Sequence, residues 1–170
     1  SGNNSSIKAV LTTDITENDG VLKADGTLAD DTSGFRVWTP IGKKGYIFEG
    51  EFDGQGHTIS GLYVNDPEAT RVGLFGSTSD TGTIKNVGVI DSYFYGDEYV
   101  GGISGSNDST ITNCYSICSV NGNTSVGGIC GYHPYGKINN CFSAGTVSAE
   151  SKFGGVCGFN YEDITNCYYD

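Results

Sequence analysis

A repeat of about 27 residues constrains this sequence more than any other feature. Four asparagines hold the same place in successive copies, at spacings of 27, 27 and 26 residues: Asn86, Asn113, Asn140 and Asn166. An isoleucine stands two residues before each asparagine, and a valine or cysteine follows it directly. A short repeat can bury its apolar face only against its neighbours, so the pattern predicts a solenoid of stacked units.

The residue types in the repeat favour strands over helices. A glycine-rich block precedes each asparagine block and begins at Val72, Val100, Val126 and Phe153, with the sequences VGLFG, VGGISG, VGGICG and FGGVCG. The segments are short, rich in Val, Ile, Thr, Tyr and Phe, and interrupted by Gly and Asn. Three short strands and three turns fill one repeat. We therefore predict an all-β, right-handed parallel β-helix (β-solenoid), with a β-sandwich of accidental similarity as the alternative.

Parallel stacking predicts columns of like residues about 4.8 Å apart. One buried column should hold the four isoleucines Ile84, Ile111, Ile138 and Ile164. The asparagines should share side-chain hydrogen bonds between turns. A weaker fifth copy aligns residues 58–62 with the asparagine block and places Leu62 in the valine or cysteine column. We expect about five coils: 36–66, 67–96, 97–122, 123–149 and a partial one from 150.

The chain divides into an N-terminal cap and one solenoid domain. Residues 36–170 follow the columns, whereas residues 1–35 do not, apart from a possible strand over residues 7–15. We expect residues 1–35 to cover the exposed strand edge at that end, with residues 1–6 as a linker or a trimmed end. The last coil stops directly after its asparagine block, so we expect a longer parent chain.

Charge and hydropathy exclude two classes of partner. The net charge of −11 disfavours nucleic acid and anionic membrane surfaces, because their phosphates would be repelled. No apolar run approaches the roughly 18 residues of a membrane span, so we expect no membrane insertion.

The six cysteines follow the columns rather than a pairing scheme. Cys114, Cys141 and Cys167 share one column, and Cys130 and Cys157 share another with Ser104. We predict that these cysteines are small, buried, reduced core residues. Cys118 aligns with Asp91 and Gly145 and has no cysteine in its column. Disulfides remain an alternative, as does a metal site at the Cys114 and Cys118 pair.

The glycine blocks resemble a known repeat. Residues 73–76, GLFG, have the GLxG form of the GLUG motif, and the blocks at 102–105, 128–131 and 155–158 are conservative variants. The chain is similar to GLUG-motif repeat proteins over about residues 36–170. The resemblance implies a bacterial surface or adhesin-like protein with a β-helix fold. Similar repeats accompany IgA-cleaving metallopeptidases, whose HExxH zinc motif is absent here.

No catalytic constellation stands out in the sequence. The columns lack the paired carboxylates that glycoside cleavage needs. Asp53 and His57 are four residues apart and could form an acid–base pair, but the surrounding glycines favour a structural corner. The acidic stretch over residues 14–31 resembles a calcium loop only loosely, because its order departs from an EF-hand. We expect no enzyme and no cofactor, with calcium as a possibility.

Aromatic residues mark the candidate binding site. They lie in the turns of the last two coils: Tyr132, His133, Tyr135, Phe159 and Tyr161. A second group at the junction of coils two and three contains Tyr93, Phe94, Tyr95 and Tyr99. Aromatic rings on a rigid scaffold suit sugar faces or peptide side chains, although they could simply cover the corners.

These observations predict a secreted or bacterial cell-surface module that acts as a spacer and as an adhesion or ligand-binding platform. Its partner would be a host or environmental glycan or protein. The alternative is an accessory or substrate-binding part of a secreted carbohydrate-active enzyme or peptidase.

Overall fold

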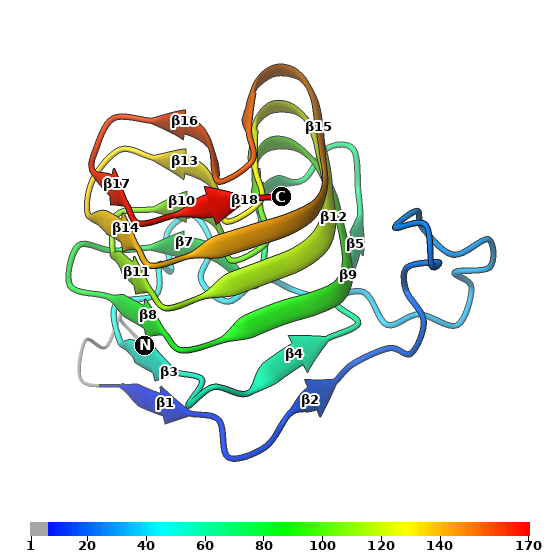
Figure 1. Cartoon of the computed structure of the whole chain (residues 1–170), viewed down its shortest axis with the longest axis horizontal. Helices are drawn as coiled ribbons and strands as arrows, with labels where there is room; N and C mark the ends of the chain where they lie inside the picture. Colours follow the sequence, from blue (N-terminus) through cyan, green and yellow to red (C-terminus); the bar gives the residue numbers. More distant parts are fainter. Residues whose placement is uncertain (1–6) are drawn as a thin grey trace.

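The computed structural model describes residues 7–170, so the predicted linker at residues 1–6 and the start of the predicted cap lie outside the described residues. The described part is all-β, and its strands stack as three parallel sheets around one core (Figure 1). The predicted parallel β-solenoid is confirmed. No helix that could span a membrane is found among residues 7–170.

The isoleucine sheet contains six strands: β1 (Lys8–Val10), β3 (Glu51–Asp53), β8 (Thr83–Lys85), β11 (Thr110–Thr112), β14 (Lys137–Asn139) and β17 (Ile164–Thr165). The short sheet contains four: β7 (Phe75–Thr78), β10 (Ser104–Asn107), β13 (Cys130–His133) and β16 (Cys157–Asn160). The long sheet contains β2 (Ile15–Thr16), β4 (Thr58–Ser60), β9 (Gly88–Gly101), β12 (Tyr115–Gly127), β15 (Phe142–Gly154) and β18 (Tyr168–Tyr169). Two further strands also pair with β9: β5 (Tyr63–Asn65) and β6 (Thr70–Val72).

Four turns of the solenoid have a strand in all three sheets, rather than the five that were predicted. The segment expected to complete the first coil reaches the short sheet only through isolated bridges, Ile41 to Phe75 and Phe48 to Thr78. The predicted alignment of residues 58–62 was also wrong, because Phe52 pairs with Ile84 whereas Ile59 pairs with Val89. Both segments have an apolar residue between polar ones, so the motif alone did not separate them.

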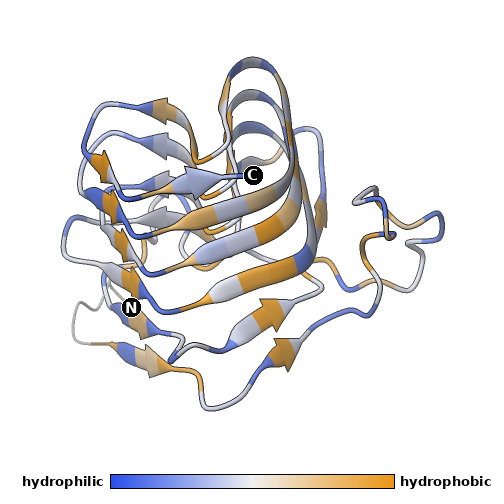
Figure 2. Cartoon of the chain, viewed as in Figure 1, coloured by the Kyte–Doolittle hydropathy of each residue, from blue (hydrophilic) through white to orange (hydrophobic). Residues whose placement is uncertain are grey.

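The isoleucine column forms as predicted. Ile84, Ile111 and Ile138 are in register and fully buried, and Ile164 continues the column at its half-buried end. Phe52 continues the column on the other side of Ile84, and Ala9 follows Phe52. Each fully buried side chain of this size contributes about 1.5–3 kcal/mol relative to exposure. Figure 2 shows this division, with apolar residues on the strands and hydrophilic ones in the turns between them.

The asparagine column also forms as predicted, and its residues adopt the left-handed conformation with φ of 50–56°. Asparagine tolerates this region better than other residues with a side chain. The Nδ2 of Asn113 donates to Oδ1 of Asn86 at 3.1 Å, and the next two bonds, Asn140 to Asn113 and Asn166 to Asn140, are 3.3 Å long. The Nδ2 of Asn86 donates to Asp53 at 3.0 Å. A continuous amide ladder therefore runs along one corner and ends on a carboxylate.

All six cysteines are free thiols, and four of them are buried. The pairing of Cys130 with Cys157 and Ser104 is confirmed. The alignment of Cys118 with Asp91 was wrong, because Cys118 stands opposite Ser92. Asp91 forms an irregularity in β9 with φ of 45°, and its carboxylate accepts a 2.9 Å hydrogen bond from the Leu22 backbone N–H. Burial raises the pKa of Cys118 to about 12, so this thiol stays protonated.

The N-terminal segment adds strands to the solenoid before it leaves its surface. Two short strands, β1 and β2, stand where a single strand over residues 7–15 was considered, and they pair with β3 and β4. Residues 18–35 then form the excursion that projects from the side of the solenoid in Figure 1. Asn18 attaches the start of this excursion to the solenoid, because the Nδ2 of Asn18 donates to the Gly61 carbonyl at 2.7 Å.

Candidate functional site

Two columns of the solenoid supply the aromatic candidates. The first column lies at a corner of the long sheet, directly before each glycine block. It holds Arg71, Tyr99, Ser125 and Lys152. The second lies on the short sheet and holds Ser77, Ser106, Tyr132 and Phe159. The first column was not recognised from the sequence, although each member directly precedes the valine or phenylalanine of the glycine block.

The corner column has an unusual backbone. Its members have φ of 63, 61, 58 and 54°, and residues other than Gly and Asn rarely adopt this conformation. The last glycine of the motif explains how the corner is packed. A Cβ on Gly105 would lie 2.6 Å from Cα of Arg71, and one on Gly131 would lie 2.6 Å from the Tyr99 carbonyl carbon. The glycine therefore permits a corner that points Arg71, Tyr99 and Lys152 away from the core.

The rings from the two columns contact one another. Tyr99 stacks on Tyr132 with centroids 4.7 Å apart, Tyr132 lies 5.8 Å from Phe159, and Tyr161 packs against Phe159 at 4.8 Å. We call these four residues the aromatic row. Ser125 lies between Tyr99 and Lys152 in the corner column and is buried. Because its side chain is small, the Tyr132 ring can lie over this position. Three of the predicted residues thus come together, and Tyr99 joins them from the second predicted group.

A cation lies at each end of the aromatic row. The Arg71 guanidinium is 5.4 Å from the Tyr99 ring centroid, and the Lys152 ammonium is 4.2 Å from that of Phe159. Such cation–π contacts each contribute about 0.5–1 kcal/mol at exposed sites. The pKa values of Tyr99 and Tyr132 are raised, mainly because both phenol groups are partly buried. Both phenols therefore remain protonated at neutral pH and can donate hydrogen bonds.

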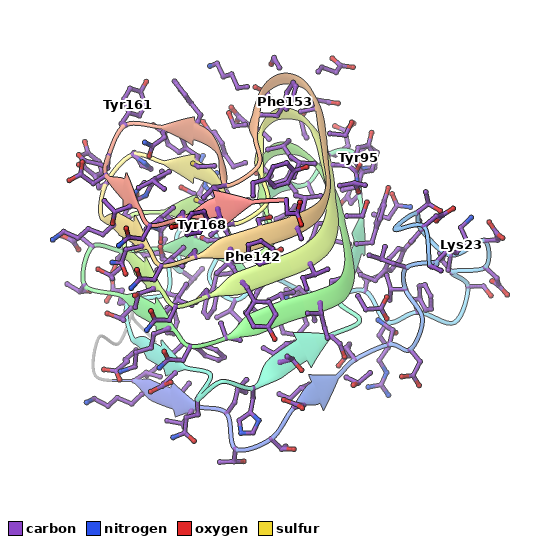
Figure 3. All side chains as sticks on the ribbon, in the orientation of Figure 1. Lys23, Tyr95, Phe142, Phe153, Tyr161 and Tyr168 are labelled. Atoms are coloured by element: carbon purple, nitrogen blue, oxygen red, sulfur yellow. The ribbon has the colours of Figure 1, made fainter. Side chains whose placement is uncertain are left out.

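Tyr135 stands beside the row between two shallow hollows. One hollow, of about 320 Å³, is formed by Tyr132, Pro134, Tyr135, Tyr161 and Glu162. Tyr135 and Tyr161 are 63% and 64% exposed, and Figure 3 shows Tyr161 projecting from the turn between β16 and β17. The other hollow, of about 390 Å³, is acidic, since Asp80 and Asp108 line it. Burial, and secondarily Asp80, raises the pKa of Asp108.

His133 does not belong to this surface. Its side chain is fully buried, so the prediction that it lies exposed with the tyrosines was wrong. It follows Thr78 and Asn107 in an inward polar column, and its Nδ1 lies 3.1 Å from the Asn107 carbonyl oxygen. Burial lowers the pKa of His133, which keeps the imidazole neutral.

The other aromatic group is dispersed. Phe94 is fully buried in the core, and Tyr93 pairs with Tyr63 at a centroid distance of 6.3 Å. Tyr95 lies on the outer side of the long sheet (Figure 3). Only Tyr99 contributes to the aromatic row.

The residues considered for catalysis or metal binding do not come together in the structure. His57 is 3.2 Å from the Asp14 carboxylate rather than paired with Asp53, and Asp53 accepts from Asn86. Asp25 and Asp31 accept backbone N–H groups two residues ahead, which is ordinary turn chemistry. Within residues 7–170 no group of three or more His, Cys, Asp or Glu side chains could hold a metal ion. The described residues therefore give the possible calcium site no support.

Comparison with known proteins agrees with this architecture. Residues 122–148, which make one turn of the solenoid, match the family described as the GLUG motif. The same columns recur in the other three complete turns. This chain therefore contains a GLUG motif. The matched GLUG motif is a β-solenoid repeat module, and its family is not a catalytic one.

Two curated proteins are similar to part of this chain. Halomucin of Haloquadratum walsbyi is 35% identical over 102 residues, which are 60% of this chain and 1% of halomucin. A "Putative Gly-rich membrane protein" of Evansella cellulosilytica is 32% identical over 79 residues, which are 45% of this chain and 9% of that protein. The chain thus spans only a small part of the length of either relative.

A solved structure has the same fold. The crystal structure of a "putative immunoglobulin A1 protease" from Bacteroides ovatus aligns with a TM-score of 0.61 and 22% identity. The alignment covers 95% of this chain and 58% of that chain. At this identity the likeness shows the fold alone.

Proposed function

We propose that this chain is a non-catalytic binding module of an extracellular or cell-surface protein, and that the aromatic row with Tyr135 binds a glycan. The observation that carries the proposal is the contact among four rings from three successive turns on one outer surface. Ligand-binding surfaces use such rings because they offer large apolar area at low entropic cost.

A glycan suits this surface better than a folded protein. The hollow beside Tyr135 is shallow, and phenol groups of Tyr132, Tyr135 and Tyr161 surround it. A protonated phenol can both donate and accept a hydrogen bond, which matches the hydroxyl groups of sugars. Row and hollow extend across turns that are stacked along one axis, so an extended chain could follow them.

The solenoid also supports a role as a spacer. Each added turn lengthens the module by about 4.8 Å without a new kind of contact. The Evansella relative is named as a membrane protein, which supports an extracellular or surface location for this chain.

Glycan-array binding tests the proposal. The wild type should bind at least one class of glycan, and the Tyr135→Ala, Tyr161→Ala double variant should lose that binding while keeping its circular dichroism spectrum and melting temperature. Both side chains are exposed, so the fold should survive their removal. Tyr168→Ala is the matched control, because Tyr168 is 68% exposed and lies on β18, away from Tyr161 (Figure 3). Equal binding by the double variant and the wild type would refute the proposal.

A further inference from the structure

A third hollow lies at the Arg71 end of the aromatic row. It has a volume of about 280 Å³ and is formed by apolar side chains, including Trp38, Pro40 and Val72, together with Lys43, Lys44 and Arg71. Typical small-molecule pockets begin at about 300 Å³, so this hollow fits one small group rather than a large ligand. The sequence analysis assigned no role to it.

The Trp38 side chain is held in a fixed position. Its backbone N–H donates to the Tyr63 carbonyl at 2.8 Å, and its indole Nε1 donates to the carbonyls of Gly73 and Leu74 at 3.2 and 3.4 Å. The following segment is tied to the short sheet by the bond from Ile41 N–H to the Leu74 carbonyl, 3.0 Å long. A ring anchored at both ends does not have to be ordered when a ligand binds, which lowers the entropic cost of binding.

The charge of this hollow is opposite to that of the chain. The chain has 9 basic and 20 acidic residues, yet three bases and one acid, Asp66, line this one hollow. Across residues 7–170 none of Lys43, Lys44 and Arg71 takes part in a salt bridge. Cations that make no salt bridge, beside an apolar floor, complement a ligand that carries an anion on an apolar ring.

Arg71 connects the hollow to the aromatic row. Its backbone lies in the corner column, it lines the Trp38 hollow, and its guanidinium lies over the Tyr99 ring. The hollow beside Tyr135 contains Glu162 and adjoins the acidic hollow of Asp80 and Asp108. The negative group of a ligand is therefore directed to the Trp38 end, and uncharged sugar faces are directed to the Tyr135 end.

We propose that the Trp38 hollow is a subsite for an anionic sugar residue, so that the ligand of this module is an acidic polysaccharide lying along the Trp38 hollow and the aromatic row. This inference rests on the proposed glycan-binding function and names its ligand class. Carboxylated and sulfated sugars present the same anion chemistry to Arg71 and the two lysines. Acidic peptides are the competing class of ligand.

Trp38 makes the test direct, because it is the single tryptophan of the chain. Its fluorescence is titrated with polygalacturonate, dextran sulfate, neutral dextran and poly-glutamate, and binding is checked by calorimetry. We expect at least one acidic polysaccharide to change the fluorescence and to bind about tenfold more tightly than dextran, with salt weakening it. Tighter binding of poly-glutamate than of either acidic polysaccharide would overturn the inference.

Charge variants locate the subsite. Arg71→Gln should weaken the acidic polysaccharide about tenfold, as expected for loss of a charge-assisted contact, and should weaken dextran less. Lys43→Gln with Lys44→Gln is a second test on an exposed turn, where folding is not at risk. Lys137→Gln is the matched control, since Lys137 is exposed, unpaired by any salt bridge of the described chain, and on the isoleucine sheet.

The outcomes separate the two proposals. Unchanged affinity in Arg71→Gln and in the double lysine variant would overturn the anionic subsite. If the Tyr135→Ala, Tyr161→Ala variant still lost binding in that case, the glycan-binding function would stand without it. Absence of binding to every polysaccharide would overturn both.

Discussion

Replacing Asn113 tests how much the amide ladder contributes to stability. Asn113 lies in the middle of the ladder, where it donates to Asn86 at 3.1 Å and accepts from Asn140 at 3.3 Å. Its φ is 54°, so an alanine there would lose both hydrogen bonds and would also be forced into the left-handed conformation.

The two effects have comparable size. The left-handed conformation costs alanine about 1–2 kcal/mol. Each intramolecular hydrogen bond contributes about 0.5–1.5 kcal/mol net, and the exposure of this column favours the lower value. Asn113→Ala should therefore lower the free energy of unfolding by about 2–3 kcal/mol. Asn113→Gly loses the same bonds without the conformational cost, so it should be about 1 kcal/mol less damaging than alanine.

Urea denaturation followed by circular dichroism measures these differences. Asn166→Ala provides a control within the ladder, because Asn166 has φ of 50° but makes one ladder bond instead of two. Its cost should be about 0.5–1 kcal/mol below that of Asn113→Ala. A glycine variant as stable as the wild type would show that the ladder adds nothing. Equal losses for alanine and glycine would refute the conformational part of the reasoning.

Three further outcomes are expected. Lys152→Asn should change the free energy of unfolding by less than about 0.5 kcal/mol in urea melts, because asparagine suits the φ of 54° better but the cation–π contact with Phe159 is lost; a larger change in either direction would contradict this. Iodoacetamide at pH 8 should modify the half-buried Cys157 and Cys167 in the native protein but not Cys118, and denaturation without reductant should release all six thiols; two or fewer would reveal disulfides. Because the folded pKa of His133 is lowered, its neutral form contributes stability that is present above the ordinary pKa of about 6.5 and is lost as pH falls toward the folded pKa. His133→Gln should flatten that dependence in melts between pH 7 and 5, and an unchanged slope would argue against it.

The columns that stack on themselves could be predicted from the sequence. The isoleucine and asparagine columns each repeat one residue type, and a parallel solenoid places like residues on top of one another. The first turn was less predictable, because it joins the short sheet through single bridges and its Phe52 replaces the isoleucine. The length of the first turn depends on the segment that contains Trp38, and this segment follows no repeat.

The candidate site was predictable only in part. Tyr132, Phe159 and Tyr161 were grouped correctly, because they follow the glycine block at similar distances. Tyr99 was assigned elsewhere, since it comes from the other column and reaches Tyr132 only across the corner. His133 was misplaced because adjacency to tyrosines says nothing about side-chain direction. Comparison with Asn107 at the same place in the preceding turn would have indicated an inward polar residue.

The amide ladder has a direction, because each Nδ2 donates toward the N-terminal side, and the Oδ1 atoms of Asn86, Asn113 and Asn140 accept from the following turn. Each completed turn therefore offers the acceptor that the next turn needs, and the first donor is satisfied by the carboxylate of Asp53. A duplicated turn inserted between β12 and β15 would find the same partners on both sides. The number of turns can consequently change by whole repeats, and the solenoid then becomes longer or shorter without a new kind of interface between turns.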